Sequence, residues 1–249
     1  MDRRTALRAA AATAAGLGAA GCGTAQVGHA SGGGTSGGPP DSVAPSPSSL
    51  LPPEVVHGPA DRPAVALTFH GQGDPGLVRQ LLAELDRGTA RVTVLAVGSW
   101  LGEQPEMARL ILDGGHELGN HTENHAEIAK MSPTQAFAEI AACAARLKTL
   151  TGSIGRWFRP SQTRYSTPVI RAQASRAGYP TCLSYDLDSL DYRDPGAAAV
   201  TRTTLDGVHN GSIVSLHFGH AGTVAALPAI LDGLRRRGLH PVTMTELVS

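Results

Sequence analysis

Apolar runs and amphipathic stretches alternate along residues 64–243. Short apolar runs rich in branched side chains are typical of buried strands, and amphipathic stretches that stop at glycine are typical of helices. We therefore predict strands at 64–69, 92–97, 116–120, 157–159, 181–185, 212–217 and 240–243. Helices are expected at 77–86, 105–112, 133–150, 168–177, 197–205 and 224–237. This alternation predicts an α/β fold built on a parallel sheet or barrel.

Polar side chains of the kinds used in catalysis follow these predicted strands. His70 follows the first strand, His121 the third and Arg159 the fourth. Asp188 follows the fifth strand, and His217 ends the sixth. The carboxyl ends of parallel strands meet at one face of a barrel, where active sites form. We therefore expect these side chains to converge.

The segment GHELGNHTENH, residues 115–125, places His121 and His125 four positions apart. Positions i and i+4 share one face of a helix, so two imidazoles at this spacing can bind one divalent metal ion. A metal ion held by two histidines and one further ligand keeps a position open for water, as hydrolytic sites require. The segment therefore predicts a site for a divalent metal ion.

Residues 1–22 resemble an export signal. Arg3 and Arg4 form a twin-arginine-like start, and the apolar stretch that follows is too short to span a bilayer. Small residues precede Cys22 as in a bacterial lipoprotein site, although Ala19 stands where a bulky aliphatic residue is usual. We expect export to the cell surface with a lipid on Cys22 as the only membrane attachment. The alternative is ordinary cleavage nearby, which gives a secreted protein.

Residues 23–57 are rich in Gly, Ser and Pro and read as a flexible tether, because they carry too little apolar surface to fold. Residues 58–249 are long enough for one domain with a sizeable core. The whole chain has a net charge of zero, and without residues 1–21 it holds 18 basic and 20 acidic residues. No basic patch is evident, so we expect no nucleic-acid partner. A monomer is expected, with Cys143 and Cys182 as buried free thiols.

The pattern resembles the NodB-homology polysaccharide deacetylases (carbohydrate esterase family four) from Ala64 to Val248. The segment from His116 to His125 meets the family's G-H-E-[IL]-G-N-H-T motif and its H-[ST]-x-x-H pair in full. The resemblance implies a distorted (β/α) barrel of about seven strands. It also implies a metal-dependent hydrolase, commonly with zinc, that removes acetyl groups from sugars such as chitin, peptidoglycan or xylan.

Three further motifs carry the resemblance and imply roles for single residues. Arg159-Pro160 matches the family's Arg-Pro motif, although Ser161 replaces the usual second proline, and Arg159 would orient the catalytic base. Asp188-Ser189-Leu190-Asp191-Tyr192 resembles D-x-x-D-W, so Asp188 would tune the catalytic acid and Tyr192 would contact sugar. Ser215-Leu216-His217 resembles the last motif, in which His217 would protonate the leaving amine.

The first motif departs from the family. Where the family has T-F-D-D-G, with a base and then a metal ligand, this chain has Thr68-Phe69-His70-Gly71 and then Asp74 three residues on. Gly71 has no side chain with which to bind metal. In one assignment Asp74 is the third ligand and His70 is the base, because a neutral imidazole can take a proton from water. In the other, His70 is the third ligand of a three-histidine site and Asp74 is the base.

Three classes of function remain open from the sequence. The first is a metal-dependent de-N-acetylase acting on a polysaccharide such as peptidoglycan or a chitin-like polymer. The second is a non-catalytic carbohydrate-binding descendant of the same fold, because both usual aspartates of the first motif are missing. The third is a hydrolase that acts on a non-sugar amide.

Overall fold

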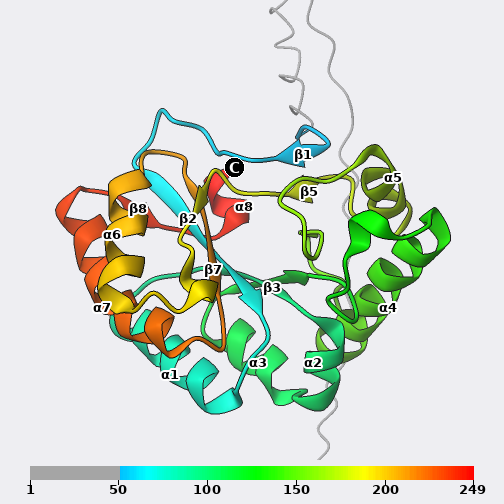
Figure 1. The fold of residues 1–249 in the computed structure, drawn as a ribbon, viewed down its shortest axis with the longest axis horizontal. Helices are drawn as coiled ribbons and strands as arrows, with labels where there is room; N and C mark the ends of the chain where they lie inside the picture. Colours follow the sequence, from blue (N-terminus) through cyan, green and yellow to red (C-terminus); the bar gives the residue numbers. More distant parts are fainter. Residues whose placement is uncertain (1–50) are drawn as a thin grey trace, which may run out of the picture. The chain divides into compact units, whose positions relative to one another are not determined.

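A computed structural model describes residues 51–249, and a twisted parallel sheet lies at its centre (Figure 1). Its strands follow the order β4-β3-β2-β7-β6, and every pairing between them is parallel. The strands are β2 (Ala64–Gly71), β3 (Thr93–Ala96), β4 (Glu117–Asn120), β6 (Leu187–Asp188) and β7 (Ile213–His217). The predicted α/β fold is therefore confirmed.

Shorter pairings extend the sheet towards a barrel. Strand β8 (His240–Pro241) pairs with the start of β2, and β1 (Glu54–Val55) pairs with β5 (Cys182–Leu183). Single bridges through Phe158 link the end of β4 to β5. Within residues 51–249 no strand pairing joins β5 to β6, so the barrel is open there, and this agrees with the distorted barrel expected from the sequence.

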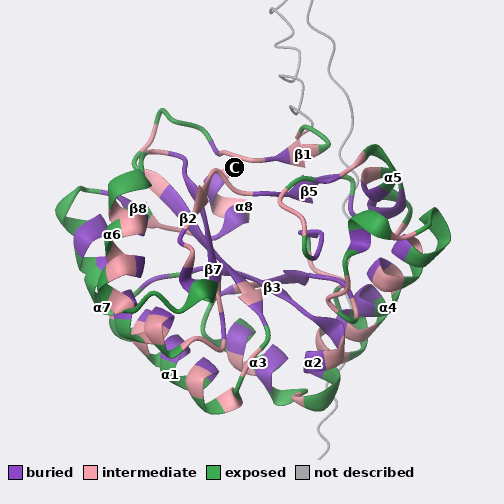
Figure 2. Cartoon of the chain, viewed as in Figure 1, coloured by how far each residue is buried: buried purple, intermediate pink, exposed green. Residues whose placement is uncertain are grey.

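Helices cover the outside of the sheet (Figure 1). Figure 2 shows the strands buried and the outer helix faces exposed, the arrangement of a barrel with a helical shell. The helices are α1 (Pro75–Arg87), α2 (Gly98–Glu103), α3 (Glu106–Asp113), α4 (Pro133–Thr151), α5 (Pro168–Arg176), α6 (Ala197–Gly207), α7 (Ala221–Arg236) and α8 (Met244–Leu247), with 3-10 turns η1 (Ile128–Lys130) and η2 (Asp191–Arg193).

Helix α4 forms where local chemistry predicts it. Ser132 caps the helix by accepting a hydrogen bond from the Gln135 backbone N–H, while the Gln135 side chain reaches back to Ser132. Pro133 occupies the first turn, and Gly152 ends the helix in the left-handed conformation (φ 83°). Its apolar face is fully buried at Ile140 and Cys143 and supports the histidine segment.

The folded part of the chain begins earlier than the predicted boundary at residue 58. Val55 is 3% exposed and pairs with Leu183, so the last residues of the expected tether belong to the domain. The export signal, Cys22 and the rest of the tether lie outside the described residues. No helix within residues 51–249 has the length and apolarity needed to cross a bilayer. Cys143 and Cys182 are buried free thiols, as predicted.

Candidate active site

Three histidines from distant parts of the chain meet at the carboxyl ends of the central strands. One nitrogen from each of His70, His121 and His125 lies within 4.8 Å of the other two. His70 is the next-to-last residue of β2, and its Nδ1 lies 2.8 Å from Nε2 of His121. The ring of His125 is 4.9 Å from the ring of His121. The structure therefore brings the predicted pair together with His70.

The pair converges through a loop, and the helix face expected from the i, i+4 spacing is absent. Residues 121–127 have no regular structure, and both Thr122 (φ 69°) and His125 (φ 53°) adopt the left-handed conformation. The Asn120 side chain accepts a hydrogen bond from the Thr122 backbone N–H at 2.9 Å. Gln162 donates to the His125 carbonyl at 2.7 Å. These bonds hold a strained backbone that aims both rings inward.

Ser161 also fixes this loop. Its hydroxyl donates to the Ala126 carbonyl at 2.5 Å and accepts from the Thr122 hydroxyl at 3.0 Å. A proline at this position would supply no hydroxyl. Serine in place of the second proline of the usual Arg-Pro-Pro motif therefore stabilises the histidine loop, which the sequence alone did not show.

The hydrogen bonds determine which histidine nitrogens carry protons. His121 Nδ1 lies 2.9 Å from the Arg159 carbonyl, which can only accept, so this nitrogen donates. His121 Nε2 therefore presents a lone pair, and Nδ1 of His70 donates to it. His70 Nε2 then accepts from the Ser215 hydroxyl at 3.0 Å. A cation at this place would take the position of the proton that His70 and His121 share.

The three imidazoles fit a divalent metal ion. Three histidines with an open position are an established zinc arrangement, and the backbone contact of His121 Nδ1 orients its other nitrogen as metal ligands require. For His70 to bind, its proton must move to Nε2, where Ser215 can accept it. Gly71 has no side chain that could bind the ion, and a Cβ there would lie 2.7 Å from Val94 Cγ1, so the space beside it is already filled.

Asp74 lies elsewhere. Its carboxylate caps α1 by accepting a hydrogen bond from the Leu77 backbone N–H at 3.0 Å. It belongs to no metal-ligating group found within residues 51–249. Of the two assignments left open by the sequence, the geometry favours the one in which His70 is the third ligand.

Burial keeps these imidazoles uncharged at neutral pH. It lowers the pKa of His70 and of His121 well below the ordinary value, and the neighbouring histidines and Arg159 lower both further. Burial also lowers the pKa of His125, with a smaller contribution from His217. Neutral imidazoles with free lone pairs are the form that a metal ion binds.

We expect the metal-free chain to lose stability as pH falls from 7 to 5. The folded histidines resist protonation, whereas in the unfolded chain each takes a proton near pH 6.5. The unfolded state then binds more protons, so the free energy of unfolding decreases. Thermal melts in chelator should show this decline, and His121→Asn should make it shallower, while His240→Asn, at an exposed position, should not. Equal slopes in all three proteins would contradict the buried neutral state.

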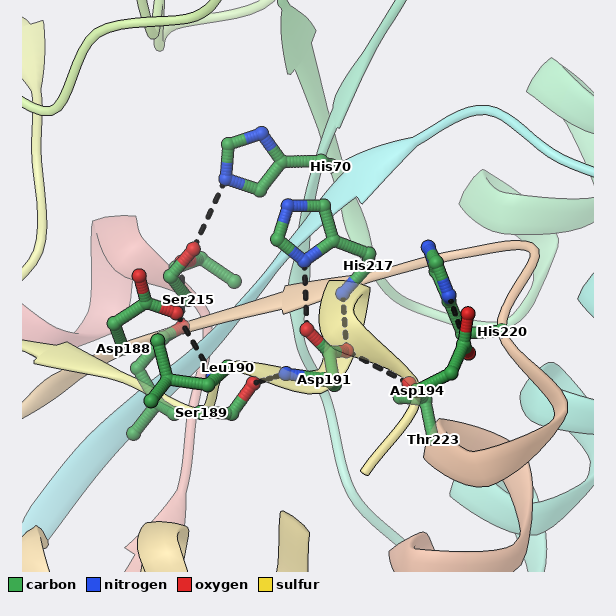
Figure 3. A network of polar contacts seen from close by, with 12 residues as sticks. His70, Asp188, Ser189, Leu190, Asp191, Asp194, Ser215, His217, His220 and Thr223 are labelled. Atoms are coloured by element: carbon green, nitrogen blue, oxygen red, sulfur yellow. Dashed lines mark hydrogen bonds and ion pairs between the residues drawn. The ribbon is translucent and has the colours of Figure 1, made fainter. Parts of the chain in front are cut away.

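His217 forms a dyad with Asp191, and Figure 3 shows the two side chains facing each other. Asp191 Oδ1 accepts from His217 Nδ1 at 2.7 Å, and Oδ2 accepts from the His217 backbone N–H at 2.8 Å and the Thr223 hydroxyl at 2.7 Å. Burial raises the pKa of Asp191, but these hydrogen bonds outweigh it, so the pKa lies below its ordinary value. Asp191 is therefore an anion that orients His217.

The expectation that Asp188 would tune His217 is corrected by this geometry. Asp188 ends β6 and accepts a hydrogen bond from the Leu190 backbone N–H at 3.0 Å (Figure 3). Turn η2 brings Asp191 back towards the end of β7, where it reaches His217. The D-x-x-D segment does supply the partner of His217, but the partner is its second aspartate, Asp191, and not its first. His217 itself lies where predicted, with its ring stacked 4.3 Å from the ring of His70.

Arg159 is fully buried beneath His70. Its Nη2 donates to the Thr68 hydroxyl at 2.8 Å and to the Ser184 carbonyl at 3.0 Å, and its Nη1 lies 3.4 Å from His70 Nε2. Burial lowers its pKa to about 10, so it stays charged. A fixed positive charge opposes formation of an imidazolium at His70. This contact therefore argues against His70 as the base.

Two clefts meet at the histidines. One, of about 470 Å³, runs past Trp100 and His220, and the other, of about 420 Å³, runs past Arg164, Asp188 and Tyr192. His70, His125 and His217 line both clefts. Tyr192 is 42% exposed, and its ring lies 5.3 Å from that of His217. The site is thus the middle of an extended groove.

Comparison with known proteins identifies the family to which this chain belongs. The family model described as "Polysaccharide deacetylase" matches residues 57–182, and this chain belongs to that family. It is 31% identical over 202 residues to a peptidoglycan-N-acetylglucosamine deacetylase of Bacillus cereus, covering 76% of this chain and 90% of the relative.

Two further matches show the range of the likeness. The chain is 24% identical to an uncharacterized protein, YlxY, of Bacillus subtilis. The match covers 80% of this chain but only 62% of that protein. The structure superposes with a TM-score of 0.75 on a CE4 family pseudoenzyme from Bacillus anthracis. That match is 22% identical and covers 80% of this chain and 70% of the other, so it bears on the fold alone.

Proposed function

We propose that this protein is a metal-dependent de-N-acetylase that acts on an N-acetylated polysaccharide of the cell envelope, with peptidoglycan as the first candidate. The observation that carries the proposal is the meeting of three uncharged histidines and the His217–Asp191 dyad in one groove. The Bacillus cereus relative, named a peptidoglycan-N-acetylglucosamine deacetylase, supports the substrate class. The export signal expected in residues 1–22 would place the domain outside the cell, held by lipid on Cys22.

In the proposed reaction a divalent cation, zinc being the expected one, would be held by His70, His121 and His125 and would polarise the amide carbonyl and the attacking water. His217 is placed to move the protons. Its Nδ1–H donates to Asp191, so Nε2 has a lone pair towards the groove and can take a proton from water. The resulting imidazolium, stabilised by the Asp191 carboxylate, then gives that proton to the leaving amine.

The other residues of the site would act by position. Arg159 holds the floor of the site under His70 through its hydrogen bonds to the Thr68 hydroxyl and the Ser184 carbonyl, and its charge opposes protonation of His70 to the imidazolium. Asp188 lines one cleft and lies at the end of β6, where a sugar hydroxyl could hydrogen-bond to it. The competing assignment, with Asp74 as ligand and His70 as base, requires Asp74 to leave its cap on α1.

Release of acetate tests the proposal. The full chain should release acetate from N-acetylglucosamine oligomers or peptidoglycan fragments, lose this activity in a chelator and regain it with zinc. Acetate release that is insensitive to a chelator would contradict the metal-dependent mechanism.

The second candidate is a non-catalytic carbohydrate-binding protein. One observation favours it, namely the absence of both usual aspartates from the first motif, where His70 and Gly71 stand instead. Binding of the same oligomers in chelator, with no acetate released under any metal, would support this candidate over the enzyme. Turnover of a simple amide without release of sugar-bound acetate would instead indicate a non-sugar substrate.

Tyr192→Ala is expected to weaken substrate binding without removing metal. An exposed ring beside His217 offers a face on which a pyranose ring can stack. A stacking contact of about 0.5–1.5 kcal/mol corresponds to roughly a 2- to 12-fold rise in KM. Tyr165→Ala is the matched control, since Tyr165 is 51% exposed but lines neither cleft. Equal steady-state constants for wild type and Tyr192→Ala would remove Tyr192 from the substrate site.

A further inference from the structure

A second group of metal-ligating side chains lies at the other end of the sheet. His57 lies between β1 and β2, Asp186 immediately precedes β6, and His209 lies between α6 and β7. One ligand atom from each lies within 4.8 Å of the other two. Asp186 accepts a hydrogen bond from the backbone N–H of Ile213, the first residue of β7, whereas His217 is the last residue of that strand. The two groups are therefore separated by about 13 Å along the strand. This group takes no part in the proposed reaction.

The distances match the needs of a small cation. His209 Nε2 lies 3.5 Å from Asp186 Oδ2, and His57 Nε2 lies 3.9 Å from the same oxygen. Tetrahedral zinc, with bonds of about 2.0–2.1 Å, places its ligand atoms roughly 3.4 Å apart. Small side-chain rotations would therefore bring the three atoms onto one ion.

Neighbouring groups orient the carboxylate. Asp186 Oδ1 accepts a hydrogen bond from the Ile213 backbone N–H at 2.6 Å, and Oδ2 accepts one from the Ser212 hydroxyl at 3.1 Å. These contacts hold Asp186 with one oxygen towards the two histidines. Fixing a ligand in this way is characteristic of metal sites in proteins.

The tautomer of His209 gives an independent indication. Its Nδ1 lies 3.1 Å from the Asn210 carbonyl, which can only accept, and 3.4 Å from His57 Nε2, so Nδ1 carries the proton and both neighbours accept it. Nε2 then presents a lone pair to the Asp186 carboxylate. Two lone pairs that face each other repel unless a proton or a cation lies between them. A proton on His209 Nε2 or a metal cation between the two atoms would each supply the positive charge that this contact needs, and the zinc content of the protein distinguishes the two.

The group is also open to solvent. The side chains of His57, Asp186 and His209 are 32%, 20% and 62% exposed, so an ion can enter and keep a water ligand. Two imidazoles and one carboxylate favour zinc or a similar divalent transition metal over magnesium or calcium. The loops are already adjacent, since Gly58 N–H donates to the Gly211 carbonyl at 2.8 Å.

We propose that His57, Asp186 and His209 form a second divalent metal site, which clamps the connection between β1 and β2 to the loops that precede β6 and β7. Its role is structural, because it ties the first strands of the domain to the central sheet. The site stands independently of the proposed enzymatic function.

Counting bound zinc in the full chain, prepared without a polyhistidine tag, tests this site. After dialysis against buffered zinc, we expect two equivalents in wild type and one each in His57→Ala, His209→Ala and His121→Ala. The double variant His121→Ala/His209→Ala should bind none. His240→Ala, which removes an exposed histidine outside both groups, should keep two.

A thermal measurement separates binding from misfolding. In the His121→Ala background zinc should raise Tm, and adding His209→Ala should abolish the shift while leaving Tm in chelator unchanged. The proposal is overturned if His57→Ala and His209→Ala keep the zinc content of wild type, or if zinc leaves Tm of His121→Ala unchanged. A result in which His209→Ala loses one equivalent and His121→Ala loses none would uphold this site and count against the catalytic metal.

Discussion

Replacing His121 with alanine is expected to remove the catalytic metal ion and at least 10²-fold of the turnover. The side chain is fully buried, and its Nδ1–H is committed to the Arg159 carbonyl, so Nε2 is the nitrogen available to bind a metal ion. Polarisation of the carbonyl and the water by a metal ion contributes several kcal/mol, which corresponds to about 10²–10⁴-fold in rate. Zinc content and acetate release should fall together, and His240→Ala should change neither. Unchanged metal content in His121→Ala would end the site assignment.

The same measurement on His70 and Asp74 decides between the two ligand assignments. We expect His70→Ala to lose the metal, because His70 Nδ1 lies 2.8 Å from His121 Nε2, close enough for one ion to bind both nitrogens. Asp74→Ala should keep the metal and lose about 1 kcal/mol of stability, the usual contribution of a helix cap. If His70→Ala keeps the metal while Asp74→Ala loses it, Asp74 is the ligand and His70 is the base.

Asp191→Asn is expected to lower kcat by about 10²–10⁴-fold while the metal stays bound. The carboxylate accepts the Nδ1 proton of His217, and an amide would favour the wrong tautomer and fail to stabilise the imidazolium. Asp188→Asn is the matched control, since Asp188 bonds to the Leu190 backbone rather than to His217. A large loss in Asp188→Asn with little change in Asp191→Asn would reverse the assignment of the dyad.

The sequence predicted the main strands because their apolar runs are continuous. Residues 64–69 and 212–217 read as buried strands and form the centre of the sheet as β2 and β7. Strand β6 was not predicted, because Leu187–Asp188 is two residues long in a polar segment. Helix α2 was also missed, since Gly98 begins it and no side chain caps its N-terminus.

The sequence predicted most residues of the candidate site, but it did not predict how they are arranged. Placement after strands identified His70, His121 and His217, because parallel strands end at one face. The spacing of His121 and His125 suggested a helix, but left-handed residues at Thr122 and His125 produce the convergence. The choice between Asp188 and Asp191 depends on turn η2, whose short path leaves no periodic signal.

The central claim is that a three-histidine metal site replaces the usual arrangement with an aspartate ligand. A crystal structure of the zinc-loaded protein, with the ion located by anomalous scattering, tests this most directly. We expect an ion about 2 Å from one nitrogen each of His70, His121 and His125, with the remaining position open to the groove. An ion bound by Asp74 in place of His70, or no ion between His121 and His125, would contradict the account.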